Sequence, residues 1–153
     1  MKKQITCTAI LSAAMVLTGC AGGSGDGQTD AKGGEKTAKI GIVQFAEHPA
    51  LDASYEGFVD TMKEAGYSED SFDYKNAQGD QSNCTTIAQT FVNDGDDLIY
   101  AIATPAAQAA ANETSDIPIL VSAVTDPAAS GLAESNDKPG GNVTGASDLT
   151  PVE

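Results

Sequence analysis

Four short polar stretches contain most of the side chains that could bind a small charged molecule. Glu47 and His48 lie in the first stretch, and Thr125 and Asp126 lie in the last. A carboxylate accepts hydrogen bonds from an ammonium group, whereas the free N–H groups at the start of a helix attract a carboxylate. This combination suits a zwitterion. The four stretches are residues 44–52, 76–80, 104–107 and 122–127.

Each of these features also has an ordinary structural interpretation. Thr104 and Pro105 predict a helix start, with the hydroxyl at the N-cap, proline at the first helical position and free N–H groups in the next turn. Those donors could hold a ligand carboxylate or simply bind water. His48, the one histidine, could bind a ligand or cap the helix that follows. Asp52 could complement a helix dipole. Both interpretations stay open for each residue.

The sequence lacks the patterns that catalysis usually requires. There is no Gly-x-Ser-x-Gly elbow, and neither the Walker nor the dinucleotide-binding glycine pattern occurs. One histidine and three cysteines do not supply a set of metal ligands. Cys84 falls near the start of a predicted helix, where a thiol can become reactive, but without a nearby histidine we expect it to pack in the core. We therefore predict no metal, no cofactor and no enzymatic activity.

Apolar strands and amphipathic helices alternate along the chain and must position these polar stretches. KIGIVQF at residues 39–45 is β-branched and apolar, as a buried parallel strand requires. Apolar residues from Leu51 to Met62 recur at helical spacing, and Gly66 is placed to end that helix. The pattern continues with strands at residues 71–76, 98–103 and 117–124 and helices at about 83–93 and 105–112.

This alternation, with short connections, predicts an α/β fold in which a parallel sheet carries helices on both faces. In such sheets a ligand binds outside the carboxyl ends of the strands, near the topological switch point. Each of the four polar stretches follows or ends a predicted strand. The fold should therefore bring all four to one edge of the sheet.

The N-terminus resembles a bacterial lipoprotein signal. Lys2 and Lys3 precede an apolar run at residues 5–17 that is too short to span a membrane. LTGC at residues 17–20 is similar to a lipobox, whose cysteine is lipidated and becomes the first mature residue. We predict a signal peptide at residues 1–19, lipidation of Cys20 and a flexible tether at residues 20–37, which are rich in Gly, Ser, Thr and Asp. An ordinary signal peptide with an incidental cysteine is the alternative.

Charge and cysteine content narrow the range of partners. The chain has 22 acidic residues, eight lysines and no arginine, for a formal net charge of −14. Such a surface argues against nucleic acid and anionic lipid as partners, because both bind patches of Lys and Arg. Without a guanidinium, neutral donors would have to hold a ligand carboxylate. Cys84 would be the one unmodified cysteine after processing, so no internal disulfide is expected.

Four sequence blocks, in order, resemble the ABC transporter substrate-binding lipoproteins of the tryptophan- and tyrosine-binding type. They extend from residue 39 to residue 152 and are IGIVQFAEHPALDASYEGFVDTMKEAGY, DYKNAQGDQSN, AIATPAAQAAANETSDIPILVSAVTDPAASGL and KPGGNVTGASDLTPV. The resemblance implies a type I periplasmic-binding-protein fold, in which two α/β lobes close on a solute. It implies an amino-acid-like ligand and the following contacts: Gln44, Glu47, His48, Asn76, Gln78, Gly79, Thr104, Pro105, Ala106, Thr125 and Asp126.

The same resemblance implies delivery of the solute to an ABC permease at the outer face of the cytoplasmic membrane. Members of the family continue into a second lobe and then return to the first, whereas this sequence stops at Glu153. We expect residues 38–153 to be an N-terminal ligand-binding lobe, a fragment of a two-lobe protein, with residues 140–152 near the hinge. A lipid-anchored extracellular α/β domain that acts as a sensor or interaction domain, without transport, is the alternative.

Overall fold

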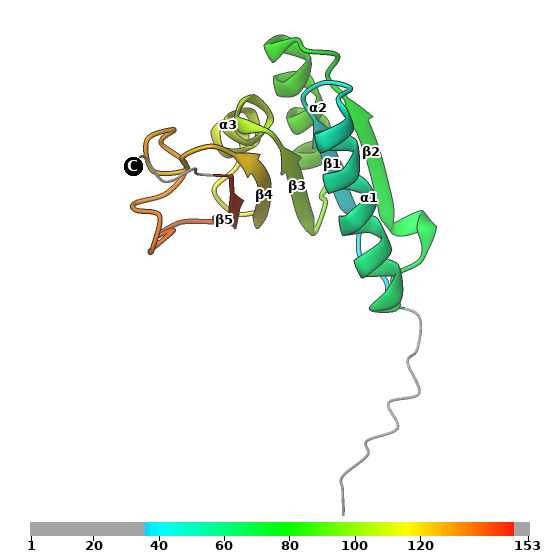
Figure 1. Ribbon diagram of the computed structural model, residues 1–153. Coiled ribbons are helices and arrows are strands. Elements are labelled where there is room, and N and C mark those ends of the chain that lie inside the picture. The colour runs from blue at the N-terminus through cyan, green and yellow to red at the C-terminus, as the bar shows by residue number, and fades with distance from the viewer. Residues whose placement is uncertain (1–35, 149–153) are drawn as a thin grey trace, which may run out of the picture. The chain divides into compact units, whose positions relative to one another are not determined.

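The computed structural model describes residues 36–148, which form a five-stranded parallel sheet with helices on both faces (Figure 1). The strand order is β2-β1-β3-β4-β5, and all neighbouring pairs are parallel. The predicted fold class is confirmed. The elements are β1 (Ile40–Gln44), α1 (Pro49–Glu64), a 3₁₀ turn (Glu69–Ser71), β2 (Phe72–Asn76), α2 (Gln81–Asp94), β3 (Leu98–Ile102), α3 (Thr104–Glu113), β4 (Ile119–Val124) and β5 (Val143–Ser147).

The predicted signal peptide, Cys20 and most of the predicted tether lie outside the described residues. Within residues 36–148, no helix is both long and apolar enough to cross a membrane.

Two hydrophobic clusters cover opposite faces of the sheet. On one face α1 packs against the central strands, with Phe58 stacked on Tyr100 at a ring-centroid distance of 4.1 Å. On the other face α2 and α3 pack around Phe91 and Cys84, both fully buried. The expected packing role of Cys84 is therefore confirmed. Small side chains let α3 lie close to the sheet, since its buried residues are all alanines: Ala106, Ala107, Ala109 and Ala110.

Capping residues explain where the helices begin and end. Gly66, which follows α1, has a φ of 98° and adopts the left-handed conformation expected of a glycine that ends a helix. α2 begins two residues before the predicted start because Asp80 caps it. The Asp80 carboxylate accepts the N–H of Ser82 at 2.7 Å and that of Asn83 at 3.2 Å. These backbone hydrogen bonds, the one from Asn83 foremost, hold the pKa of Asp80 below its usual range.

Strand β5 is missing from the sequence-based prediction, which placed residues 140–152 near a hinge. Its pairing with β4 includes the register Ile119↔Val143, followed by an irregularity between Val121 and Val124. Gly145 makes the close approach of the two strands feasible, because a Cβ there would lie 2.0 Å from the carbonyl oxygen of Val121. One valine among Gly, Thr and Ser is a weak apolar signal, so backbone pairing rather than hydrophobic pattern defines this strand.

One part of the sheet carries no helix within the described residues. α1 contacts β3 and β4, and its cluster includes Leu120 of β4, whereas β5 is exposed from Thr144 to Ser147. The least covered part of this face is therefore β5 with the adjoining part of β4. We call this region the open sheet face. A shallow hollow on it is mostly apolar, and none of its side chains is charged; it is lined by Phe58, Thr61, Tyr100, Leu120, Val121, Ser122, Gly145 and Ala146.

Candidate functional site

The connections that follow β1, β2, β3 and β4 meet at one edge of the sheet, here called the carboxyl edge. Because β1 lies between β2 and β3, the chain leaves β1 toward one side and later returns to the other. This topological switch point is where parallel α/β sheets usually bind ligands. Gln44 ends β1 and pairs with both Asn76 of β2 and Ile102 of β3. All four predicted stretches are therefore at the carboxyl edge.

Three of the predicted ligand-binding residues surround one open hollow of about 450 Å³. Glu47, Asn76 and Gln78 line it together with Ala46, and Glu47 is the one charged side chain among these described residues. The Asn76 side-chain oxygen accepts the backbone N–H of Gln78 at 2.7 Å, which helps hold Gln78 at a φ of 57°. Gly79 ties this connection to the neighbouring one by donating its N–H to the Phe45 carbonyl at 2.7 Å. The Glu47 side chain thus lines a hollow whose other side chains lie on a connection held by hydrogen bonds.

Gln44 lies beneath these connections rather than at their surface. Its side chain is fully buried, and its Nε2 donates to the Ala46 carbonyl at 2.8 Å and to the Asp52 carboxylate at 2.6 Å. The carboxamide oxygen is buried and has no hydrogen-bond partner among residues 36–148. These contacts fasten the first turn of α1 to the end of β1. Direct contact between Gln44 and a ligand stays a prediction.

His48 caps α1. Its Nδ1 accepts the N–H of Ala50 at 3.2 Å, and the ring is exposed. Because Nδ1 is the acceptor, a neutral ring carries its proton on Nε2, which this bond leaves free to donate to another group. Of the two interpretations of His48, capping is the one that the structure contains.

The start of α3 differs from the prediction in one residue. Ala103, and not Thr104, is the N-cap, and it has the unusual dihedral angles φ 82° and ψ 154°. Thr104 and Pro105 are therefore the first two helical residues. Within the described part of the chain no side chain caps this end, and Ala107 is the first residue whose N–H reaches an acceptor one turn back, the Ala103 carbonyl at 3.1 Å. The N–H groups of Thr104 and Ala106 are the donors left for a ligand, since proline has none.

Asp126 is held by hydrogen bonds within the connection between β4 and β5. One oxygen of its carboxylate accepts the N–H of Ala129 at 3.0 Å and the side-chain amide of Asn136 at 3.2 Å. The Asn136 side chain in turn accepts the N–H of Ala128 at 3.1 Å. These bonds, led by that from Ala129, hold the pKa of Asp126 below its usual range. Thr125 beside it is exposed. Sequence reasoning missed Asn136 because its partner is ten residues away.

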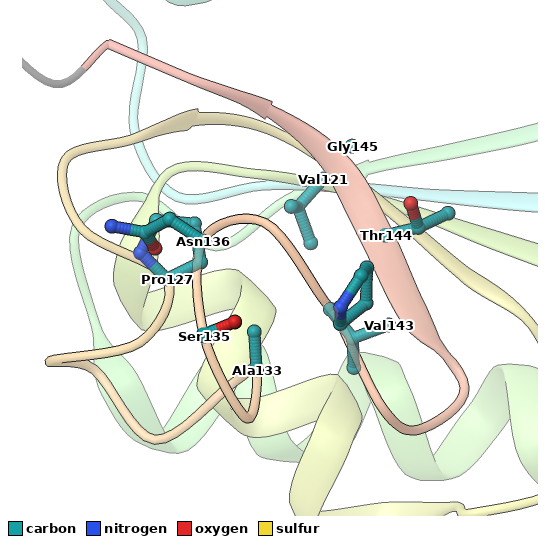
Figure 2. A pocket seen from close by; sticks show the side chains of 9 residues that line it. Val121, Pro127, Ala133, Ser135, Asn136, Val143, Thr144 and Gly145 are labelled. Atoms are coloured by element: carbon teal, nitrogen blue, oxygen red, sulfur yellow. The ribbon is translucent and has the colours of Figure 1, made fainter.

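Figure 2 shows a second hollow, between β4, β5 and the long connection that joins them. Pro127, Ser135 and Asn136 come from the connection, while Val121 and Val143 come from the strands. Its volume of about 50 Å³ has room for only a few water molecules. None of the predicted ligand-binding residues lines it. The open hollow beside Glu47 is the better candidate for a small solute.

A buried carboxylate lies at the opposite, amino edge of the sheet. Asp96 is 4% exposed, and the Lys39 ammonium lies 3.3 Å from its Oδ1. Burial raises the pKa of Asp96, and the Lys39 contact offsets only part of that effect. Gly41 gives this carboxylate its space, because a Cβ there would lie 2.5 Å from Asp96 Oδ2. Among residues 36–148, no group of three or more His, Cys, Asp or Glu side chains is arranged to hold a metal ion.

Comparison with known proteins gives one consistent result. The family model for ABC transporter substrate binding proteins matches residues 39–153. A curated tyrosine-binding protein from Clostridioides difficile is 46% identical over 147 residues, which are 90% of this chain and 42% of that protein. The chain therefore spans about two fifths of the length of this relative.

Solved structures agree with this relationship. The ligand-free, open structure of a substrate-binding protein with adhesive properties from Clostridium difficile has a TM-score of 0.74 at 50% identity. An ABC domain from Streptococcus pneumoniae, solved in complex with L-Trp, has a TM-score of 0.72 at 47% identity. Each comparison covers 76% of this chain and 40% of the other.

Proposed function

The chain belongs to the family of ABC transporter substrate-binding proteins, and from this premise we propose that it binds an aromatic amino acid for delivery to a membrane permease. The observation that carries the proposal is its similarity to a tyrosine-binding protein, and a relative solved with L-Trp supports it. One relative is named for binding and the other was solved with a bound amino acid, which supports a role without catalysis. Because the chain spans about two fifths of these relatives, the activity of the whole protein is inferred.

The carboxyl edge offers complementary partners to the two charged ends of an amino acid. We place the ligand ammonium in the open hollow, because Glu47 is the one anionic group that lines it. We place the ligand carboxylate at the start of α3, where Thr104 and Ala106 have N–H groups without a side-chain cap. A sequence without arginine has to hold a carboxylate by such neutral donors.

The other predicted contacts complete the two sides of this arrangement. Asn76 and Gln78 line the hollow together with Glu47, Gly79 ties their connection to Phe45, and His48 offers a donor at the start of α1. Pro105 extends the start of α3, and Thr125 and Asp126 lie on the connection after β4. Gln44 supports the Glu47 segment from beneath through Ala46.

The N-terminal sequence supports an extracytoplasmic location. We propose that Cys20 is lipidated and holds the protein at the outer face of the cytoplasmic membrane, with residues 20–37 as a tether. Two acyl chains on one cysteine would give firm retention, whereas a single chain binds reversibly. The partners are then the permease subunits of the same transporter.

A titration of the chain with L-tryptophan, L-tyrosine and 3-(4-hydroxyphenyl)propionate, followed by NMR, tests the proposal. The last compound is tyrosine without its ammonium group. A binding energy near −8 kcal/mol, as in a micromolar complex, would fall to about −4 if one lobe supplied half of it, so a millimolar Kd is expected. Both amino acids should shift amide signals at the carboxyl edge, and the analogue should bind more weakly. If neither amino acid bound at concentrations well above millimolar, the proposal would be wrong.

A further inference from the structure

Tyr100 links three elements beneath the carboxyl edge. Its ring is 4% exposed and stacks on Phe58 of α1, and its hydroxyl lies 2.6 Å from the Ser122 hydroxyl of β4 and 3.3 Å from the Ser54 carbonyl of α1. A carbonyl can only accept, so Tyr100 donates to Ser54 and receives its other hydrogen bond from Ser122. The phenol thus connects β3, where it originates, to β4 and to α1.

Ser122 connects Tyr100 to the carboxyl edge of the sheet. Its backbone carbonyl accepts the N–H of Ala103 at 3.0 Å, and Ala103 is the strained N-cap of α3. The residue after Ser122, Ala123, has a φ of 54° and lies within the irregular part of the β4–β5 pairing. Ser122 is therefore held by its side chain just where the regular pairing between β3 and β4 ends.

We propose that Tyr100 is a positioning residue for ligand binding, acting through Ser122 on the two connections that follow β3 and β4. This inference rests on the proposed function, because the proposed function assigns Thr104 and Thr125 to a ligand site. Without the phenol hydroxyl, Ser122 would lose its side-chain partner and Ala103 would be held less firmly. The donors at the start of α3 would then be less well placed for a ligand carboxylate.

The test compares Tyr100→Phe with Tyr55→Phe in the whole chain. Both substitutions remove one phenol hydroxyl, but the Tyr55 ring packs at a tilt against Tyr74, and among the described residues the phenol bonded to Ser122 is that of Tyr100. NMR measures two quantities in each variant, namely hydrogen exchange at the Ala103 amide and the Kd for L-tryptophan. Tyr100→Phe should speed that exchange and weaken binding, each by about fivefold, whereas Tyr55→Phe should change neither.

Ser122→Ala provides the second arm. If Tyr100 acts through Ser122, Ser122→Ala should weaken binding to the same extent, and the double variant should bind no more weakly than either single variant. Unchanged Ala103 exchange in Tyr100→Phe would overturn the inference, and so would faster exchange with unchanged affinity. A wild-type chain that bound no aromatic amino acid would instead contradict the proposed function, while Ala103 exchange would still decide whether the link from Tyr100 exists.

Discussion

The Asp96 carboxylate lies 3.3 Å from the Lys39 ammonium but forms no hydrogen bond with either oxygen among the described residues. Its pKa is raised by burial, so the native state binds this proton more tightly than the unfolded chain does. This contribution to stability is fully present below the usual Asp pKa of about 3.9 and is lost as the pH rises through the higher native value.

We therefore expect Asp96→Asn to be at least as stable as the wild type at pH 7, with an advantage that shrinks toward pH 4. Urea unfolding at several pH values measures this difference. Asp97→Asn is the matched control, since Asp97 is the exposed neighbour that accepts the backbone N–H of Lys39 at 2.9 Å. A variant that became steadily less stable than the wild type as the pH rose would contradict the assignment.

Asn136→Ala should loosen the connection between β4 and β5, because it removes both hydrogen bonds that Asn136 makes to Asp126 and Ala128. Hydrogen exchange at the Ala128 amide should become faster, while Asn112→Ala, an exposed change on α3, should leave it unaltered. Because the pKa of Asp126 is lowered in the native state, the contribution of its carboxylate to stability is fully present above the usual Asp pKa. That contribution is lost only as the pH falls through the lower native pKa. Equal exchange in the two variants would show that this pair does not close the connection.

Glu47→Gln should weaken L-tryptophan binding by about tenfold or more, because a hydrogen bond to a charged group contributes about 1.5–3 kcal/mol. The same change should barely affect 3-(4-hydroxyphenyl)propionate, which has no ammonium group. Glu56→Gln, on the exposed side of α1, is the control. Equal losses for the amino acid and the analogue would mean that Glu47 does not bind the ammonium.

Thr104→Ala should weaken L-tryptophan binding by about tenfold, since its hydroxyl is placed beside the free N–H groups of α3 and caps nothing itself. Thr85→Ala should not, because the Thr85 hydroxyl already donates to the Gln81 carbonyl within α2. Titration by NMR compares the two. Unchanged affinity in Thr104→Ala would move the carboxylate elsewhere, with donors from a second lobe as the first alternative.

Cys20→Ala should release the mature protein from the membrane fraction, because the proposed acyl chains are attached to that sulfur. Fractionation of expressing cells, with an antibody to the folded part, measures the distribution. Cys84→Ala is the control, since this thiol is buried in the core and should have no part in anchoring. Retention of Cys20→Ala in the membrane pellet would require another anchor.

Regular elements could be predicted from the sequence wherever hydrophobic burial determined them. The strand at β1 and the helix before Gly66 have strong periodicity, and both were predicted to within a few residues. β5 was missed because its pairing depends on backbone hydrogen bonds and on the absence of a side chain at Gly145.

The carboxyl edge was predicted from topology alone, but its local geometry was not. Ala103 takes the N-cap position in a conformation that alanine rarely adopts, and no propensity would assign it there. The buried Gln44 side chain donates a hydrogen bond to Asp52, eight residues later on the next element. Contacts of this kind arise from tertiary packing and have no local signature.

The open sheet face has a consequence for how solutions of this chain behave. Its hollow has no charged side chain, whereas the chain as a whole carries a formal charge of −14. At low ionic strength the mutual repulsion of so many carboxylates keeps molecules apart, and added salt shortens the range of that repulsion to about 10 Å at 0.1 M. Salt would therefore allow the open sheet faces of two molecules to meet. Purified samples should aggregate least in a buffer of low ionic strength.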